Sequence, residues 1–376
     1  MTKFETRLAP GDLCVIKFGS AVLTTDGLGV DANTAMAGWV SDIAVLRQRQ
    51  VQVVLVSSGA VAEGVRRLGW SARPTKLHEL QAAAAMGQMG LVQAWESRFA
   101  EFGLRTAQVL LTHGDLADRT RYLNARTTLL TLVTAGGVPI VNENDVVASE
   151  ELRFGDNDTL AGLVANLLGA RLLMLLTDQP GMLRADPKVD PDAELIEFAE
   201  VSDPSLDKAA GGGDSRLGRG GMKSKLNAAR LAARSGTDTV IADGRAPGVI
   251  QQIASGASCG SRLRADRGVL AARKRWLVGG LRVAGKLTID AGAVKVLRQS
   301  GRSLLAVGVL SSEGRYQRGD LVSCADEAGV EVARGLVNYS AEEVAVIAGQ
   351  PTTRFADLLG CAREDELIHR DNLVVV

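Results

Sequence analysis

Apolar residues along this chain form short continuous runs that alternate with stretches of helical periodicity. Continuous runs of this length are typical of strands buried on both faces of a sheet, and they occupy 13–18, 51–56, 107–111, 138–141, 171–177 and 239–242. Helical patterns occupy 36–47, 77–102, 122–135, 159–168, 226–235 and 248–253. The alternation predicts an α/β fold in which a mainly parallel sheet is sandwiched by helices.

The pattern changes towards the C-terminus. Residues 258–275 are polar and basic, and beyond them short alternating runs at 285–289, 304–309, 320–324 and 330–336 predict a small β-rich domain with turns at 312–314 and 327–329. A length of 376 residues also exceeds what one core usually supports. We therefore expect a first domain at 1–258, a linker at 259–273, a second domain at 274–354 and a tail at 355–376, whose end is either a last strand or unstructured.

Two polar clusters flank apolar segments in the stretch 139–160. They consist of Asn142, Glu143, Asn144 and Asp145, and of Asp156, Asn157 and Asp158. Polar side chains are costly to bury without partners, so the clusters indicate a polar pocket. One residue of the second cluster can instead serve as the cap of the helix that follows, although capping does not explain all seven.

Several polar residues stand where predicted strands end: Lys17, Ser58, Asp145 and Asp178. Ligands bind at the carboxyl ends of strands in open parallel sheets, so these residues are candidates for one site. For Lys17 the alternative is a lysine that snorkels outward, and for Ser58 with Gly59 a plain tight turn is equally compatible.

A glycine-rich basic loop at 208–225 precedes the helix at 226–235. Glycines let the backbone approach a ligand closely, and Lys223 and Lys225 can neutralise phosphate. The loop lacks the GK[ST] ending of a P-loop, and a solvated flexible loop is the simpler interpretation when the loop is taken by itself.

Composition limits the partners. The 43 basic and 43 acidic residues cancel, so no global charge attracts nucleic acid or a membrane surface. No apolar run has membrane-spanning length and the start lacks an apolar signal core, so we expect a cytoplasmic protein without membrane contact. The cysteines Cys14, Cys259, Cys324 and Cys361 are too scattered for a zinc site and are expected to be ordinary thiols. The small residues of 77–102 predict close helix packing, and we expect a homo-oligomer.

A set of short segments resembles the amino-acid kinase family. They are VIKFGS at Lys17, VSSGAVAEG at Ser58, AAAAMGQ at Gln88, LNARTTL at Asn124, VNENDVVA at Asp145, FGDND at Asn157, LLTDQPG at Asp178 and GRGGMKSKL at Lys225. The C-terminal segments KRWLVGG, AGKLTID, GAVKVL and YQRGDLV resemble a PUA domain, a fold otherwise met in RNA-modifying proteins. The two resemblances together cover nearly the whole chain. One departure is Arg219, where many relatives carry a small hydroxyl residue.

Within that family the resemblance is to the members that phosphorylate the side-chain carboxylate of L-glutamate with ATP, the first step of proline biosynthesis. It implies catalytic roles for Lys17, Asp158 and Lys225, with Asp158 holding both ammonium groups. It places glutamate against Ser58, Asp145 and Asn157, where Asp145 receives the α-ammonium group and the others bind carboxylate.

The resemblance also implies a nucleotide site. Its residues are Lys17, Gly19 as a backbone donor, Thr177, Asp178, Arg219, Gly220, Gly221, Met222, Lys223, Ser224 and Lys225. Mg²⁺ would bridge the phosphates, and the motifs name no protein ligand for it. Feedback inhibition by L-proline is expected.

Two alternatives stay open at this point. One is a kinase of the same fold that acts on acetylglutamate or aspartate, although an acidic partner for a free α-ammonium group disfavours an acetylated substrate. The other is an RNA-binding or RNA-modifying protein that works through the C-terminal domain. Because Lys295, Arg298, Arg302 and Arg318 are intermixed with acids, RNA binding is better regarded as an accessory function.

Overall fold

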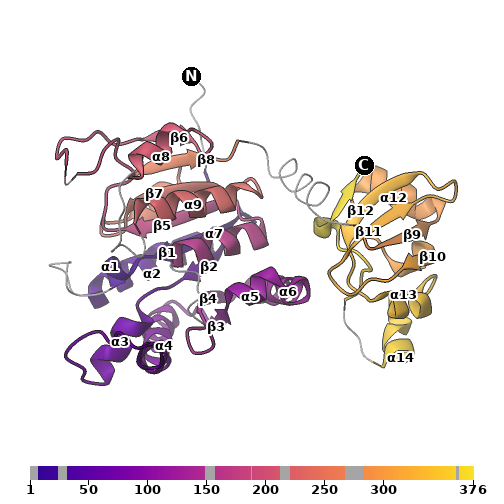
Figure 1. Cartoon of the computed structure of the whole chain (residues 1–376), viewed down its shortest axis with the longest axis horizontal. Coiled ribbons are helices and arrows are strands. Elements are labelled where there is room, and N and C mark those ends of the chain that lie inside the picture. The colour runs from indigo at the N-terminus through magenta and orange to yellow at the C-terminus, as the bar shows by residue number, and fades with distance from the viewer. Residues whose placement is uncertain are drawn as a thin grey trace. The chain divides into compact units, whose positions relative to one another are not determined.

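The computed structural model describes residues 7–23, 32–148, 157–187, 189–211, 221–266, 283–360 and 364–376, without the side chains of 32–34, 119 and 371. The chain divides into two compact units, of which the first contains strands β1 to β8 and the second β9 to β13 (Figure 1). None of the described helices is long and apolar enough to cross a membrane.

The first unit is built on one sheet with the strand order β3-β4-β2-β1-β5-β7-β8-β6. Its strands are β1 Leu13–Phe18, β2 Gln52–Val56, β3 Thr106–Leu111, β4 Val138–Glu143, β5 Leu172–Thr177, β6 Phe198–Glu200, β7 Asp238–Asp243 and β8 Ser261–Arg264. The run from β3 to β7 is parallel, whereas β8 is antiparallel to β7 and β6 is parallel to β8. The predicted mainly parallel sheet is confirmed, and β1, β2, β4 and β5, which carry the polar residues, lie together in it.

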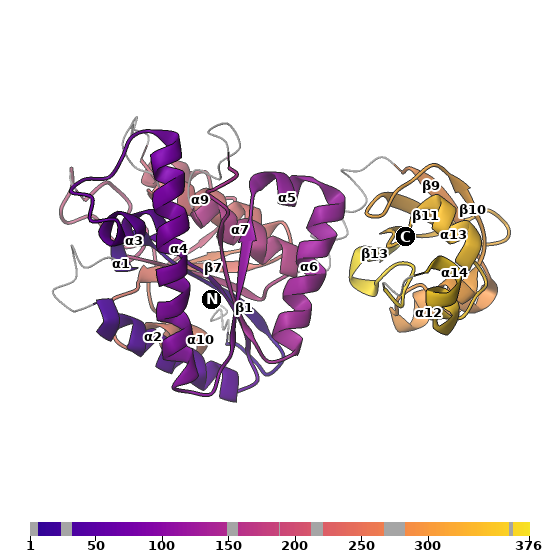
Figure 2. The same cartoon turned by 90° about the horizontal axis from the view of Figure 1, so that it is seen from below.

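Helices cover both faces of this sheet. They are α1 Ser20–Leu23, α2 Ala32–Gln48, α3 Ala60–Arg67, α4 Leu77–Ala100, α5 His113–Ala117, α6 Arg119–Thr134, α7 Asn157–Leu168, α8 Ser205–Ala209, α9 Met222–Ala233 and α10 Val249–Ala254. Helices α2, α4 and α10 lie beside the sheet (Figure 2), and α2 contacts both of the others. Their apolar residues form one core with alternate residues of the central strands. Helices α7 and α9 pack against each other and against β5, and both begin at the edge where the parallel strands end.

Helix α4 packs unusually closely against α3. A Cβ atom at Gly64 would lie 1.7 Å from the carbonyl oxygen of Ala83, and one at Gly87 would lie 1.8 Å from that of Ala60. Only glycine allows two helix backbones to approach this closely. The close packing predicted for 77–102 is therefore present, and its partner is a helix of the same chain.

Helices α7 and α9 meet at a third glycine. A Cβ atom at Gly162 would lie 2.5 Å from the carbonyl oxygen of Ala228 and 2.9 Å from its Cα atom. This contact sets the distance between the first turns of the two helices, where Asp158 and Lys225 lie.

The second unit contains a small sheet with the order β10-β9-β11-β12-β13. Its elements are β9 Gly285–Ile289, α12 Ala291–Ser300, β10 Val309–Gly314, β11 Leu321–Ala325, β12 Glu331–Leu336, α13 Ala341–Ile347, α14 Phe355–Leu359 and β13 Leu373–Val375. Short 3₁₀ helices span Ala306–Gly308, Thr352–Arg354 and Arg370–Asn372. The predicted β-rich second domain is confirmed. Its helices α12, α13 and α14 were not predicted, because the sequence shows no clear helical periodicity there.

Three details differ from expectation. The strand expected at 304–309 is wrong, because Gly308 donates its N–H to the Leu305 carbonyl at 3.2 Å and the chain turns before β10 begins at Val309. Strand β8 lies within the stretch expected to be a linker. The expected tail contains helix α14, and of the two alternatives for its end the structure has the last strand, β13, which pairs with β12.

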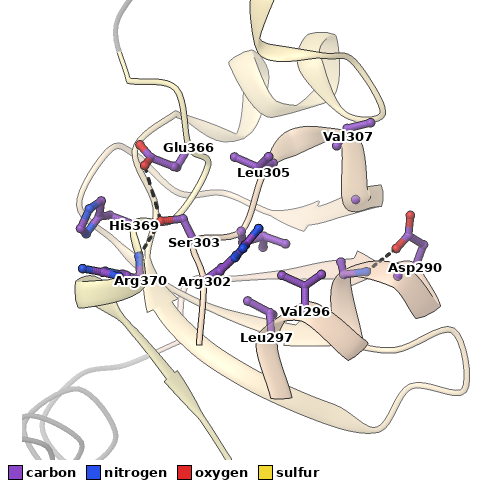
Figure 3. A pocket seen from close by; sticks show the side chains of 14 residues that line it. Asp290, Val296, Leu297, Arg302, Ser303, Leu305, Val307, Glu366, His369 and Arg370 are labelled. Atoms are coloured by element: carbon purple, nitrogen blue, oxygen red, sulfur yellow. Dashed lines mark hydrogen bonds between the residues drawn. The ribbon is translucent and has the colours of Figure 1, made fainter. Parts of the chain in front are cut away.

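The second unit also has a pocket of about 690 Å³ that is open to solvent (Figure 3). Val296, Leu305 and Val307 give it an apolar side, whereas Ser303 accepts a hydrogen bond from the Arg370 N–H at 3.0 Å at the polar end. Its volume lies in the range of small-molecule sites. The alternating strand pattern alone does not reveal such a pocket.

The described cysteines carry free thiols, as expected. Burial raises the pKa of Cys14 and of Cys324 to about 12, so both stay protonated and unreactive at neutral pH. Cys361 lies outside the described residues.

The contact between α7 and α9 gives a stability prediction. Gly162→Ala forces two helix backbones apart and should lower the free energy of unfolding by about 1 to 3 kcal/mol, as overpacking usually does. Gly38→Ala is the matched control: Gly38 lies in a helix with nothing within 4 Å of a Cβ atom, so its replacement should stabilise by about 0.5 to 1 kcal/mol. Urea unfolding of both variants measures the difference, and equal effects would contradict the assigned contact.

Candidate active site

The polar residues singled out in the sequence gather at the edge where the parallel strands end. Lys17 is the penultimate residue of β1, Ser58 follows β2, Asp145 lies in the turn after β4, and Thr177 closes β5 with Asp178 directly behind it. At the end of β2, Gly59 has a φ of 93°, a left-handed conformation that favours glycine and turns the chain straight into α3. The topology thus brings together residues that are up to 161 positions apart, from Lys17 to Asp178.

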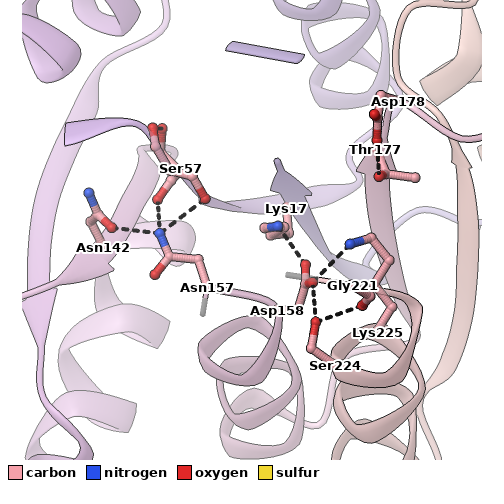
Figure 4. Close-up of polar contacts among 11 residues, drawn as sticks. Lys17, Ser57, Asn142, Asn157, Asp158, Thr177, Asp178, Gly221, Ser224 and Lys225 are labelled. Carbon is pink, nitrogen blue, oxygen red and sulfur yellow. Dashed lines mark hydrogen bonds and ion pairs between the residues drawn. The ribbon is translucent and has the colours of Figure 1, made fainter. Parts of the chain in front are cut away.

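The carboxylate of Asp158 lies between two lysines. Lys17 Nζ is 2.5 Å from Oδ1 of Asp158, and Lys225 Nζ is 3.0 Å from Oδ2 (Figure 4). All three residues are buried, with exposed fractions of 4% for Lys17, 5% for Lys225 and 0% for Asp158. We call Lys17, Asp158 and Lys225 the lysine–aspartate triad.

Burial opposes ionisation of Asp158, but the two ammonium groups outweigh it and hold the pKa of this carboxyl below its usual value. Asp158 is therefore ionised at neutral pH. With both lysines protonated, the three groups sum to a charge of +1. Ser224 adds a hydrogen bond from its hydroxyl to Oδ2 of Asp158 at 2.8 Å, which fixes the carboxylate further.

A second network surrounds Asn157, the residue before Asp158. Its Nδ2 donates to the Ser57 carbonyl at 2.7 Å, to Oδ1 of Asn142 at 2.9 Å and to the Ser58 hydroxyl at 3.1 Å (Figure 4). The Ser57 carbonyl can only accept, so the amide nitrogen of Asn157 must face this network. The two neighbouring residues at the start of α7 thus point in different directions: Asn157 belongs to the amide network, and Asp158 belongs to the triad.

Comparison with known proteins agrees with this geometry. The sequence model of the Amino acid kinase family matches residues 12–243, which is more than half of the chain and includes both networks. The chain belongs to the amino acid kinase family. The model of the PUA domain matches residues 285–359 in the second unit.

Curated relatives resemble the chain over almost its full length. A protein named glutamate 5-kinase from Ectopseudomonas mendocina is 58% identical over 362 residues, covering 96% of this chain and 97% of that protein. The protein of the same name from Pseudomonas aeruginosa strain PAO1 is 59% identical over 362 residues, with the same coverage of each chain. That from Methylococcus capsulatus is 56% identical over 361 residues, covering 96% of each chain.

Two expectations about single residues of the amino acid kinase domain do not agree with its geometry. The backbone N–H of Gly19 donates to the Leu176 carbonyl at 3.0 Å, so it is engaged within the sheet and is not a free donor for phosphate. Both Nδ2 hydrogens of Asn157 are used by protein acceptors. Asn157 therefore offers a ligand only its carbonyl oxygen, which suits an ammonium group better than the carboxylate we expected.

The expected nucleotide residues divide between described and undescribed parts of the chain. Gly221 precedes α9, whose first turn contains Met222, Lys223, Ser224 and Lys225, and whose free N–H groups attract anions. Thr177 donates a hydrogen bond to Asp178 at 3.1 Å, and Arg245 donates to the Asp178 carbonyl at 2.6 Å. Arg219, Gly220 and the candidate cap Asp156 lie outside the described residues.

Sequence reasoning missed two contributors to the amide network. The Ser57 contact uses a backbone carbonyl, for which the sequence carries no side-chain signal. Gln88, which accepts a hydrogen bond from Asn142 at 2.7 Å, lies in a helix whose Ala and Met neighbours indicate packing and not binding. Its place in the AAAAMGQ segment was the only available signal.

The described residues do not form a metal centre by themselves. Among them, no group of three or more His, Cys, Asp or Glu side chains could hold a metal ion. Asp158, the most buried carboxylate of the site, is already occupied by two ammonium groups.

The lowered pKa of Asp158 gives a pH prediction. A group whose pKa is lower in the folded state stabilises the fold above its unfolded-state value of about 4, and this contribution is lost as the pH falls through the folded-state pKa. Asp158→Asn should cost about 3 to 5 kcal/mol of unfolding free energy at pH 7, because it breaks a buried ion pair, and progressively less below pH about 4.

Urea unfolding between pH 7 and pH 3 measures this difference. The exposed Asp192 provides the control, and Asp192→Asn should leave the pH dependence as in the wild type. A stability difference for Asp158→Asn that stays constant over the whole range would contradict the assigned coupling.

Proposed function

We propose that this protein transfers the γ-phosphoryl group of ATP to the side-chain carboxylate of L-glutamate. The observation that carries the proposal is the buried lysine–aspartate triad, which presents two ammonium groups beside the N-terminus of α9. The full-length similarity to proteins named glutamate 5-kinase supports the same substrate.

The chemistry needs little beyond alignment and charge. A carboxylate is already ionised at neutral pH, so it attacks phosphorus without a general base, and catalysis consists of positioning and of stabilising charge on the phosphoryl oxygens. Lys17 supplies that charge from strand β1 and Lys225 from helix α9, and both elements are held by the fold. Asp158 acts as a positioning residue, because its carboxylate fixes both ammonium groups before the substrates bind.

The glutamate site lies on the side of the amide network. Asp145 is half-buried directly after β4, and its carboxylate receives the substrate's α-ammonium group. The carbonyl oxygen of Asn157 adds a second acceptor for that group. Ser58 accepts from Asn157, so its own hydroxyl hydrogen is directed to a carboxylate oxygen. An acetylated substrate lacks the ammonium charge that this arrangement recognises.

ATP binds in the part of the site next to the lysine–aspartate triad. Its phosphates lie against Lys17 and the first turn of α9, with Thr177 and Asp178 beside them. Arg219 and Gly220, which lie outside the described residues, stay candidate nucleotide contacts from the resemblance alone. Gly19 contributes by lacking a side chain, since a Cβ atom there would lie tightly against the Leu176 carbonyl oxygen, at 3.3 Å, and in contact with Lys17 Nζ. A Mg²⁺ ion bound together with the nucleotide would offset part of the phosphate charge, and it would take most of its ligands from outside the described side chains.

We place the reaction in the cytoplasm, where ATP and glutamate are available, and expect the enzyme to work as a homo-oligomer. The PUA unit gives no reason to prefer RNA as the main partner, because the triad lies in the kinase domain. RNA binding would be an accessory property of the second unit.

The role of Lys225 can be tested by replacing it with alanine. If it acts mainly on charge that develops during transfer, Lys225→Ala should lower kcat by about 10²- to 10³-fold and leave the glutamate KM nearly unchanged. The exposed Lys76 serves as the control, and Lys76→Ala should keep wild-type kinetics. Steady-state assays with both substrates varied measure this. A rise confined to the glutamate KM would show that Lys225 binds ground-state glutamate instead.

Asp145 should behave differently. Asp145→Ala removes a charged partner of the substrate's ammonium group, so the glutamate KM should rise by about 10- to 100-fold with little change in the ATP KM. The same assays decide the matter, with the fold checked by circular dichroism. An unchanged glutamate KM would remove Asp145 from the substrate site.

Proline is expected to compete with glutamate, because it carries the same carboxylate and a charged amine. Added L-proline should raise the apparent glutamate KM without lowering kcat at saturating glutamate. N-acetylproline, which lacks the charge, should have little effect. If proline leaves the apparent affinity for glutamate unchanged, overlap with the Asp145 pocket is wrong.

A further inference from the structure

Gln88 is a buried polar residue that the mechanism above does not use. It lies in the middle of α4, and only 8% of its surface is exposed. Its Oε1 accepts a hydrogen bond from Nδ2 of Asn142 at 2.7 Å. Its Nε2 is buried and has no hydrogen-bond partner. A buried donor of this kind has lost its hydrogen bonds to water without gaining any within the protein, which is destabilising and requires an explanation.

The orientation of the Gln88 amide follows from unambiguous groups. The backbone N–H of Glu143 can only donate, and it donates to Oδ1 of Asn142 at 2.9 Å. The nitrogen of the Asn142 amide must therefore point the other way, towards Gln88. Asn142 Nδ2 can only donate, so the Gln88 atom that faces it must be the oxygen. The Nε2 group of Gln88 is thereby left as the donor without a partner.

The backbone around Gln88 cannot retreat from this position. The preceding residue, Gly87, lies in the close contact between α4 and α3, where a Cβ atom would be 1.8 Å from the Ala60 carbonyl oxygen. Helix α3 starts directly after Ser58 and Gly59. The helix pair therefore holds Gln88 rigidly beside the turn that carries Ser58, and a rigid donor is suited to recognition.

Gln88 also lies at the end of the site away from the two lysines. Asn142 bonds both to Gln88 and to Asn157, and it lies on the far side of Asn157 from Lys17 and Asp158 (Figure 4). The reacting carboxylate of glutamate must lie at the lysines, so its α-carboxylate lies at the opposite end. That carboxylate needs donors, and the Nδ2 hydrogens of Asn157 are already used.

We propose that Nε2 of Gln88 donates a hydrogen bond to the α-carboxylate of bound L-glutamate and so helps to determine specificity for an amino acid. The proposal rests on the function proposed above. Under this proposal the hydrogen-bonded amides of Gln88, Asn142 and Asn157 recognise the substrate together. The Gln88 end donates to the carboxylate, and the carbonyl oxygen of Asn157 accepts from the ammonium group.

Gln88→Glu isolates the donor. The variant keeps an oxygen to accept from Asn142 and replaces the donor by a carboxylate that repels the substrate. At pH 8 the glutamate KM should rise by about 10- to 100-fold, with the ATP KM unchanged and kcat altered less than about threefold. Lowering the pH to 6 protonates the introduced acid, whose pKa burial raises, and the new O–H group should restore part of the affinity.

Two further variants complete the test. Gln88→Met removes acceptor and donor together, so the glutamate KM should rise without any recovery at pH 6, and this result stands even if Gln88→Glu fails to fold. Gln93→Glu introduces the same charge at an exposed position of the same helix and should leave the glutamate KM as in the wild type.

The outcomes separate the two proposals. If the wild type phosphorylates glutamate and folded Gln88→Glu and Gln88→Met keep its glutamate KM at both pH values, the donor serves a buried water and the Gln88 proposal is overturned alone. If the wild type does not phosphorylate glutamate, the proposed function fails and the Gln88 proposal fails with it. A raised KM that recovers at pH 6 in Gln88→Glu, and not in Gln88→Met, supports it.

Discussion

The structure of the site depends on one buried carboxylate between two ammonium groups. Two lysines buried this deeply would repel each other and lose their hydration, and Asp158 compensates for both. With both lysines protonated, the three groups of the triad carry one more positive than negative charge. An enzyme that moves a phosphoryl group gains from such an excess, since the charge is fixed by the fold before the nucleotide arrives and needs no reorganisation during transfer.

Under the proposed function, the amide network meets a different requirement. Glutamate brings both a positive and a negative group at its backbone end, and neutral amides can offer either an acceptor or a donor without a net charge. The Ser57 carbonyl and the Glu143 N–H fix which atom each amide presents. The beginning of α7 then separates the two tasks, with Asn157 directed to the network and Asp158 to the triad.

Close helix contacts hold these side chains in place. Gly162 brings α7 against α9, and Gly87 with Gly64 brings α4 against α3. Beneath the network, Nε1 of Trp95 donates to the Ser57 hydroxyl at 3.1 Å, and the Trp95 ring packs 5.0 Å from that of Phe18. The polar site is thus supported by the apolar core of the sheet, so that small shifts in packing reach the reacting groups.

The sequence by itself determined the parallel sheet, because short apolar runs such as Leu13–Phe18 alternate with helical patterns, as is typical of strands covered on both faces by helices. It also determined which polar residues stand at strand ends, since their positions follow directly from those runs. The strand expected at 304–309 is wrong. Leu304, Ala306 and Val309 are buried, but the chain between them forms a 3₁₀ turn, and the burial pattern of this turn resembles the alternation of a strand only in part. Only the tertiary structure decided which atoms of these residues are already bonded within the protein. The engaged N–H of Gly19, the committed amide of Asn157 and the unpaired Nε2 of Gln88 all follow from partners far away in the chain, and local sequence carries no information about them.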